Sequence, residues 1–147
     1  MAQAPHAFRL RHGRHSQPQQ IYLVTAVTHL RQPFFQDFVC ARQLVGVLRQ
    51  AQMRQQASTL AYVVMPDHLH WLMQLGEGQA LSACVQRIKS LSAHNAPGRL
   101  WQKGFHDHAV RKEEDLPALA RYIVSNPVRA GLVTRTGLYP HWDAVWV

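Results

Sequence analysis

The sequence predicts an α+β fold, with one domain that has an antiparallel β-sheet and helices packed mainly on one face. Its 147 residues suit a single domain, and 47% of them are hydrophobic, which is enough to bury a core. The apolar patterns follow the order strand, helix, strand, strand, helix, strand, helix. Only Pro66 and Asp67 separate the second and third strands, so these strands form an antiparallel hairpin, which excludes a purely parallel sheet.

A basic arm precedes the domain, which then opens with a strand and a helix. Residues 1–19 are polar and basic and are predicted to form an N-terminal arm, whereas the domain spans residues 20–147. Residues 20–30 are β-branched and apolar on both faces, as in a well-covered strand. Residues 37–56 have apolar side chains at helical spacing, which predicts a buried stripe of Ala41, Leu44, Val45, Leu48 and Ala51.

The hairpin strands cover residues 59–65 and 68–75. Because strand side chains alternate between faces, the apolar set of the second strand points to the core. This set comprises Leu69, Trp71, Met73 and Leu75. The opposite face carries His68, His70, Leu72 and Gln74.

Two more helices and a fourth strand complete the predicted order. A helix over residues 80–95 is followed by a strand over residues 100–110 and by a helix over residues 113–126, which must stop near Pro127. The aromatic tail, residues 137–147, is expected to pack against the domain. The buried stripe of the helix over residues 80–95 is predicted to comprise Leu81, Val85, Ile88 and Leu91, with Arg87 and Lys89 outside it.

The charge is lopsided and favours a polyanionic partner. There are 16 Lys and Arg residues against 8 Asp and Glu residues, for a net charge of +8. No acidic residue occurs before Asp37 or between Gln79 and His106. Nucleic acid is the first candidate partner and an anionic membrane surface the second. The candidate phosphate contacts are Arg9, Arg11, Arg14, Arg87, Lys89, Arg121 and Arg129.

The sequence points to a reduced, cytoplasmic compartment. The N-terminal stretch has no apolar core of a signal peptide, and no apolar run approaches the ~20 residues that span a bilayer. Cys40 and Cys84 lie in apolar, helix-like contexts and are expected to be reduced core residues. We therefore expect a cytoplasmic, nucleoid-associated protein with no membrane partner.

Two histidines in the second hairpin strand form a candidate metal site. His68 and His70 share one strand face, about 7 Å apart along the strand, so both imidazoles can lean toward one ion. A chain with ten histidines can contain such a pair by chance, and His106 and His108 form a second pair. Two surface histidines without a ligand are therefore an equal interpretation, and a metal site needs a third ligand.

The helix before Pro127 offers a phenol and a carboxamide. Tyr122 lies at the edge of the apolar stripe of this helix, and Asn126 follows one turn later on the same face. An amphipathic residue at the helix rim and a polar helix end are the simpler interpretation of these two residues. The stripe itself comprises Leu116, Leu119, Ala120 and Ile123.

Two stretches together resemble a known family. YVVMPDHLHWLMQL, at residues 62–75, and LWQKGFHDHAVRKEEDLPALARYIVSNPVRAGLV, at residues 100–133, are similar to the REP-associated tyrosine transposases. These proteins belong to the IS200/IS605-like, single-tyrosine branch of the HUH nucleases, whose metal motif is two histidines around a hydrophobic residue. The resemblance covers residues 20–147 and implies a ferredoxin-like α+β domain.

The resemblance also implies roles for individual residues. By matching positions, His68, His70 and Asn126 would hold a divalent metal ion, Mg²⁺ or Mn²⁺, and Tyr122 would be the nucleophile; Zn²⁺ is also compatible with imidazole ligands. Some relatives have Gln at the position of Asn126, which is shorter. The implied activity is cleavage of single-stranded or hairpin (REP-type) DNA and strand transfer through a 5′-phosphotyrosine, by a monomer or a homodimer.

Other functions are also compatible with the residues. A domesticated protein of this fold could bind hairpin DNA with little chemistry, and an RNA-binding module would share the charge. A hydrolase could hold a metal on both histidine pairs and act on another substrate. The acceptor of the Tyr122 proton is likewise open among water, a metal-bound hydroxide, His106 and His108.

Overall fold

The computed structural model describes residues 19–146, so residues 1–18 of the predicted arm, with Arg9, Arg11 and Arg14, lie outside the described part. The strands are β1 (Ile21–Val27), β2 (Ala57–Met65), β3 (His68–Leu75), β4 (His106–Ala109) and β5 (Trp142–Ala144). The helices are α2 (Phe38–Met53), α3 (Leu81–Ser92), α4 (Leu116–Val124) and α5 (Asn126–Arg129), with 3-10 turns at His29–Arg31, Phe34–Gln36 and Thr136–Leu138. None of these helices is long and apolar enough to cross a membrane.

All five strands pair antiparallel in one sheet with the order β4-β1-β3-β2-β5. The first four strands, with α2 and α3, follow the β-α-β-β-α-β order of a ferredoxin-like domain. The predicted α+β fold is therefore confirmed. The fifth strand was not predicted, because the tail offers only a short aromatic run. In the structure the tail extends the sheet, with Ala144 opposite Ala61 and Trp142 opposite Val63.

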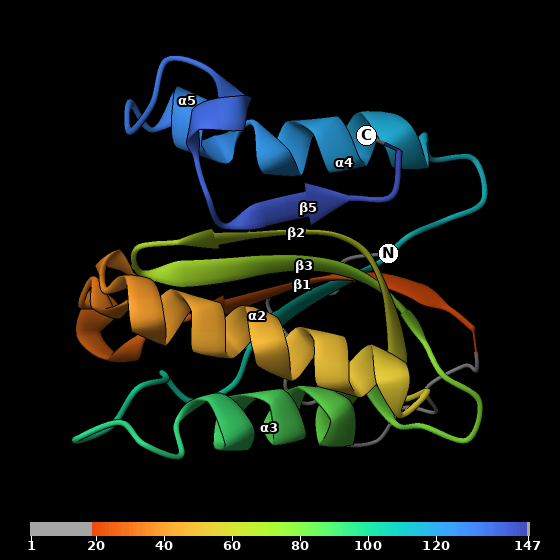
Figure 1. The fold of residues 1–147 in the computed structure, drawn as a ribbon. Coiled ribbons are helices and arrows are strands. Elements are labelled where there is room, and N and C mark those ends of the chain that lie inside the picture. The colour runs from red at the N-terminus through yellow and green to blue at the C-terminus, as the bar shows by residue number, and fades with distance from the viewer. Residues whose placement is uncertain (1–18, 147) are drawn as a thin grey trace.

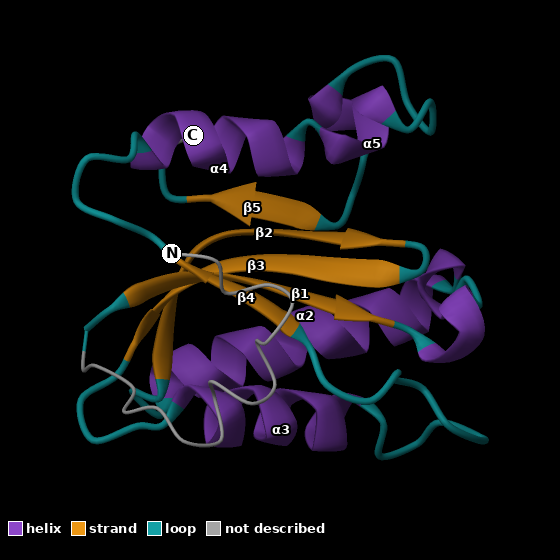
Figure 2. Cartoon of the chain, turned by 180° about the vertical axis from the view of Figure 1, so that it is seen from behind, coloured by secondary structure: helices purple, strands orange, loops and turns teal. Residues whose placement is uncertain are grey.

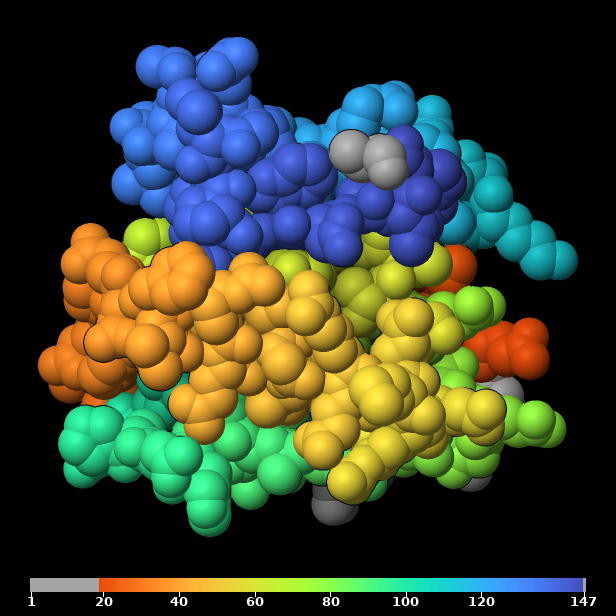
Figure 3. Space-filling model, viewed as in Figure 1, coloured from red at the N-terminus to blue at the C-terminus, as the bar shows by residue number. Residues whose placement is uncertain are grey.

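Helices cover both faces of the sheet, α2 and α3 on one and α4 on the other (Figure 1, Figure 2). The first face holds the larger core, in which Trp71, Leu69 and Met73 are buried as predicted. On the second face Leu72 of β3 and Ile123 of α4 belong to one buried cluster. Figure 3 shows α2 and the C-terminal segment lying along each other on the surface of the molecule. The second face matters for function, because His68 and His70 alternate with the core residues and point toward it.

The structure corrects the predicted buried face of α3. Leu91 was predicted to be buried but is 39% exposed, whereas Ser92 is 5% exposed. Lys89 was predicted to lie outside the buried stripe and to contact phosphate, yet its side chain is buried, because its long aliphatic stem packs inward. Its ammonium donates to the carbonyl oxygens of Gln102 and Gly104 at 2.8 and 2.5 Å. Lys89 therefore fastens a loop to α3 and is removed from the candidate phosphate contacts.

The first strand is shorter than predicted because the chain turns sharply after it. The Thr28 hydroxyl donates to the carbonyl oxygen of Gln32 at 2.8 Å. Leu30 and Arg31 then adopt positive φ angles of 55° and 51°, a left-handed conformation that ends strand pairing. The turn lies next to the hairpin, because the backbone N–H of Thr28 donates to the carbonyl oxygen of Asp67 at 3.0 Å.

The helix predicted over residues 113–126 is shorter and broken. It begins as α4 after Asp115, whose carboxylate accepts from the backbone N–H of Ala118 at 3.0 Å and caps the helix. It ends at Val124, and Asn126 opens the short helix α5 instead of completing the last turn of α4. Pro127 explains the break, since proline lacks the N–H that an unbroken helix would need there.

Candidate active site

The paired histidines lie at the start of β3, on the face that α4 covers. Their rings meet edge to face, with centroids 4.7 Å apart. The Nδ1–H of His68 donates to a carboxylate oxygen of Asp67 at 2.8 Å, and Nδ1 of His70 lies 2.9 Å from the hydroxyl oxygen of Thr25. Partners of this kind orient metal-binding histidines in proteins. With both Nδ1 atoms held, each Nε2 is the ring nitrogen left to face an ion.

The charge state of His70 suits a ligand. Burial, and after it the charges of His68 and Arg129, lower the pKa of His70 to about 4. The ring is therefore neutral near pH 7, which is the form that binds a metal ion. Burial alone would raise the pKa of Asp67, but the hydrogen bond and charge of His68, together with Arg31, hold this pKa below its ordinary value. The carboxylate thus stays ionised beside the pair.

All four tyrosines of the chain lie within the described residues. Tyr122 is the one whose side chain is open to solvent. It is 63% exposed, whereas Tyr22 and Tyr62 are 2% and 6% exposed. The hydroxyl of Tyr139 donates to the carbonyl oxygen of Val64, and burial raises the pKa of Tyr139 to about 12. Burial is also the largest of the effects that raise the pKa of Tyr62. A substrate therefore reaches Tyr122 far more readily than any other phenol.

The break between α4 and α5 gives Tyr122 an unusual set of contacts. Its carbonyl oxygen accepts from the Ser125 hydroxyl at 2.9 Å and from Nη1 of Arg129 at 2.7 Å. The guanidinium of Arg129 also lies over the tyrosine ring, with Cζ 3.8 Å from the ring centroid. Tyr122 and Asn126 are consequently joined by a turn, and the prediction that they share one continuous helical face was wrong.

The tyrosine turn and the histidine pair lie at the same end of the molecule. Figures 1 and 2 show α5 and the C-terminal end of α4 on the side where β2 ends and β3 begins. Val124 packs in one buried cluster with Met65, the residue that pairs with His68 across the hairpin. The positive charge of Arg129 also acts on His70. The exposed tyrosine and the two histidines therefore lie at the same end of the molecule.

The donor set suits a divalent ion if oxygen atoms complete it. Within residues 19–146, no three His, Cys, Asp or Glu side chains are grouped so that they could hold a metal ion. His68 and His70 carry two imidazoles, and the half-buried Asn126, at the start of α5, carries a carboxamide oxygen that could complete such a set. A set of two imidazole nitrogens, one amide oxygen and water oxygens fits Mn²⁺. It also fits Mg²⁺ if water supplies more of the ligands.

The second histidine pair lies on β4, across β1 from the first. His106 pairs with Thr25, which in turn pairs with His70, so these three side chains form a row on one sheet face. His108 is drawn away from that row, since its Nε2 lies 3.0 Å from a carboxylate oxygen of Glu114. The two histidine pairs are thus separated by β1.

The remaining candidate phosphate contacts of the described chain lie on two surfaces. Arg121 is exposed on α4, directly before Tyr122, and Arg129 is exposed but already engaged with the tyrosine. Arg87 is half-buried on α3, which covers the opposite sheet face, and its Nη1 atom is buried without a hydrogen-bond partner. Arg87 and the arginines of α4 and α5 thus do not form one continuous patch.

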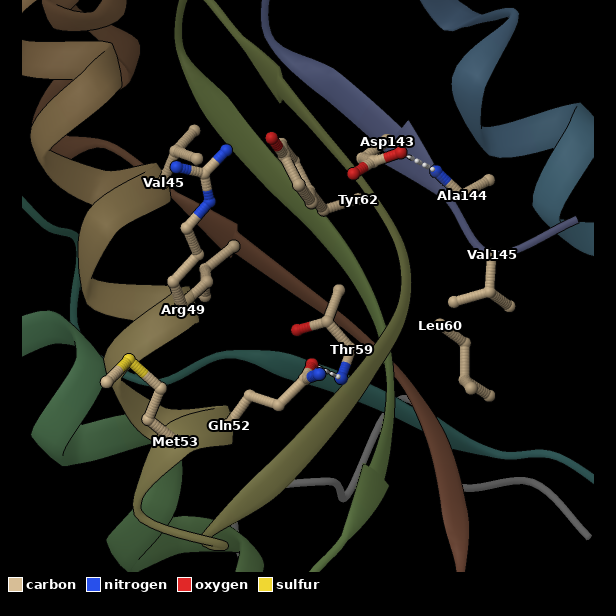
Figure 4. Close-up of a pocket in the computed structure, with 11 residues that line it drawn as sticks. Val45, Arg49, Gln52, Met53, Thr59, Leu60, Tyr62, Asp143, Ala144 and Val145 are labelled. Carbon is tan, nitrogen blue, oxygen red and sulfur yellow. Dashed lines mark hydrogen bonds between the residues drawn. The ribbon is translucent and has the colours of Figure 1, made fainter. Parts of the chain in front are cut away.

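A groove of about 380 Å³ lies apart from the histidine pair, between α2 and the outer edge of the sheet (Figure 4). Its walls include Leu48 and Met53 of α2 and Leu60 of β2. Tyr62 and Asp143 also line it, and neither His68, His70 nor Tyr122 does. The groove is therefore not part of the candidate active site.

Two residues of the site were missed from the sequence. Thr25 is placed beside His70 by the register between β1 and β3, which residue patterns within one strand do not reveal. Asp67 was interpreted only as a turn residue, although an acid directly before a histidine pair is a signal for a carboxylate that orients a ligand.

A family comparison matches the part of the chain that builds this site. The family described as "Transposase IS200 like" matches residues 16–126, which include the histidine pair and Tyr122 and end at Asn126. The chain belongs to the IS200-like transposase family. The resemblance predicted from the sequence is thereby confirmed.

Relatives of this IS200-like transposase have related names. A Haemophilus influenzae protein with the provisional name of REP-associated tyrosine transposase is 31% identical, over 56% of this chain and 56% of its own length. A REP-associated tyrosine transposase of Escherichia coli is 34% identical, over 54% of this chain and 50% of its own length. The chain thus spans about half the length of these relatives.

A solved structure shares the fold of this IS200-like transposase. It is a REP-associated tyrosine transposase bound to a REP hairpin, with a TM-score of 0.73 at 24% identity. The likeness covers 88% of this chain and 79% of that one. It confirms the arrangement of strands and helices around the candidate site.

Proposed function

We propose that this chain cleaves single-stranded or hairpin DNA and transfers the cut strand through a 5′-phosphotyrosine on Tyr122. The observation that carries the proposal is an exposed tyrosine at the end of the sheet where His68 and His70 stand side by side. Family membership supports a transposase. One structural relative was solved with a REP hairpin, so hairpin DNA of that class is the partner we propose.

The proposed chemistry follows from a phenol and a phosphodiester. The Tyr122 oxygen attacks phosphorus in line, so that a new O–P bond forms and the bond from phosphorus to the 3′ oxygen breaks. The phenol proton passes to water, and the leaving 3′ oxygen takes up a proton and becomes a free 3′-OH. The phosphotyrosine conserves the energy of the phosphodiester bond. A 3′-OH of another strand can therefore attack the phosphotyrosine and join to the cut strand without ATP.

His68, His70 and Asn126 are the residues we propose for holding a divalent ion, Mg²⁺ or Mn²⁺. Such an ion would supply a positive charge that polarises a nonbridging oxygen of the phosphate. Asp67 and Thr25 orient the two imidazoles through their Nδ1 atoms. His70, with its lowered pKa, is ready to bind without first losing a proton.

Arginines of the arm, of α3 and of α4 are proposed as phosphate contacts. They would fix the strand without reading its sequence. Arg129 differs from the others, because its guanidinium is already stacked on Tyr122. The proposed contacts are Arg9, Arg11, Arg14, Arg87 and Arg121.

Covalent capture of DNA tests the proposed function. Incubation with a 3′-labelled hairpin oligonucleotide and Mn²⁺ should give a protein–DNA band that survives denaturing electrophoresis. Tyr122→Phe should bind the same DNA and give no band, whereas Tyr62→Phe, which removes a phenol outside the site, should keep it. A wild-type protein that binds hairpins without any adduct would support the DNA-binding alternative, and free 5′-phosphate ends would support a hydrolase.

A mixing experiment decides whether one chain or two build the site. His70→Ala and Tyr122→Phe should each lack adduct formation on their own. If the tyrosine of one chain acts at the histidine pair of a partner, the mixture of the two variants recovers part of the activity. If all residues act within one chain, the mixture stays inactive.

A further inference from the structure

Arg129 joins the two sides of the break between α4 and α5. The carbonyl groups in the last turn of a helix lack partners within that helix. Arg129 supplies one for Tyr122, because its Nη1 donates to the Tyr122 carbonyl oxygen at 2.7 Å and also to the hydroxyl of Ser125. One side chain of α5 thereby spans the break and fixes α5 to the end of α4.

The same guanidinium sets the position of the tyrosine ring. Its Cζ lies 3.8 Å from the ring centroid, a distance at which a cation attracts the ring face. Burial does not hold this ring, since Tyr122 is 63% exposed. Without the stacked cation, an exposed tyrosine would sample its other side-chain rotamers.

We propose that Arg129 is a positioning residue, which holds the Tyr122 ring in one orientation and ties it to the turn that carries Asn126. This role rests on the proposed function, because the orientation of the ring affects a rate only if Tyr122 is the nucleophile. Arg129 then acts through Tyr122 on the covalent step. A phosphate contact, by contrast, would act on the affinity for DNA.

Kinetics separate these two roles. Arg129→Ala should slow single-turnover adduct formation by about 10- to 100-fold, since a small displacement of a reacting group costs about that much. Its dissociation constant for the hairpin should stay within about twofold of the wild-type value. Arg129→Lys keeps a cation but loses the planar fork of donors, so it should recover only part of the rate. Weaker DNA binding with a salt slope reduced by about one would identify a phosphate contact and overturn the proposal.

The ring contact can also be measured without DNA. Labelling with 3-fluorotyrosine gives ¹⁹F signals for the tyrosines, and the signal lost in Tyr122→Phe identifies Tyr122. We expect Arg129→Ala to move this signal toward that of free fluorotyrosine and Arg129→Lys to fall between the two. Arg135→Ala, which removes another exposed arginine, should leave the signal unchanged.

The two readouts fail separately. An unchanged Tyr122 signal in Arg129→Ala would show that Arg129 does not hold the ring and would overturn the proposal, whatever the activity. A wild-type protein that forms no adduct would instead overturn the proposed function. The ¹⁹F spectra would then still decide whether the guanidinium positions the ring.

Discussion

His68 and His70 differ in their surroundings, although they share one strand face. His68 donates to a carboxylate, which orients its ring and leaves Nε2 of the neutral ring free of a proton. His70 lies beside the neutral hydroxyl of Thr25 and has its pKa lowered to about 4. The lowered pKa of His70 favours binding of a metal cation over binding of a proton at that ring.

Removal of either imidazole should abolish metal binding without unfolding the protein. His68→Ala and His70→Ala each delete one of two nitrogens on an edge of the core, and each should eliminate the heat of Mn²⁺ binding in calorimetry. His94→Ala removes an exposed histidine outside the site and should bind Mn²⁺ as the wild type does. Unchanged affinity in both site variants, with circular dichroism like that of the wild type, would reject the metal assignment.

His70 should also make the metal-free protein less stable in mild acid. Its pKa in the folded protein, about 4, lies below the ordinary value of 6.5. As the pH falls between these values, the unfolded chain takes up a proton that the folded chain excludes, so the free energy of unfolding decreases; the loss is complete below about pH 4. Urea unfolding in EDTA measures the free energy of unfolding at each pH. Between about pH 7 and pH 5 this free energy should fall by roughly 1–2 kcal/mol less in His70→Gln than in the wild type. Equal losses in both proteins would contradict the lowered pKa.

The elements were largely predictable, because their apolar periods are strong. β3 matches its predicted range of residues 68–75, since the alternation of Leu69, Trp71 and Met73 leaves one register. β5 was not predicted, because three residues pair only where β2 offers a free edge. The break before Asn126 depends on Pro127, but the contacts across it depend on the Arg129 side chain, which donates back to the Tyr122 carbonyl oxygen. Short strands and the side-chain contacts at helix ends could therefore not be predicted from the sequence alone.

Asn126 follows the break in the tyrosine helix, and its loss should cost less than the loss of a histidine. Water can replace one neutral oxygen ligand, whereas it replaces an imidazole poorly. Asn126→Ala should therefore weaken Mn²⁺ binding and slow adduct formation by a smaller factor than His68→Ala or His70→Ala. Asn126→Gln tests the reach of the side chain and should keep more activity than Asn126→Ala. A loss as large as that of the histidine variants would show that the carboxamide has a larger role.

The whole molecule divides its functions between the two faces of the sheet. α2 and α3 bury the larger core on one face, and α4 covers a smaller cluster on the other face, where the partly buried His68 and His70 lie (Figure 1). The difference between the two faces follows from the alternation in β3, where the core residues point to one face and His68 and His70 point to the other. Composition predicted a polyanionic partner but not the residues that would contact it. Lys89 is buried, whereas Arg121 lies directly before Tyr122, the proposed nucleophile.

DNA binding should depend steeply on salt. The net charge of +8 makes phosphate contacts the main source of affinity, and each contact releases counterions. Fluorescence anisotropy should show hairpin affinity falling at least about tenfold between roughly 50 and 200 mM salt. Plain duplex should compete poorly against the hairpin. A flat salt series, or a preference for duplex, would contradict the proposed partner.

The most direct test identifies the atom that DNA becomes attached to. Trypsin cleaves after Arg121 and Arg129, so Tyr122 is released in a peptide that contains no other tyrosine. After the adduct is digested with nuclease and trypsin, mass spectrometry should find a nucleotide on Tyr122, joined through its 5′ phosphate. A nucleotide on Tyr62 or Tyr139, attachment through a 3′ phosphate, or cleavage without any modified peptide would contradict Tyr122 as the nucleophile.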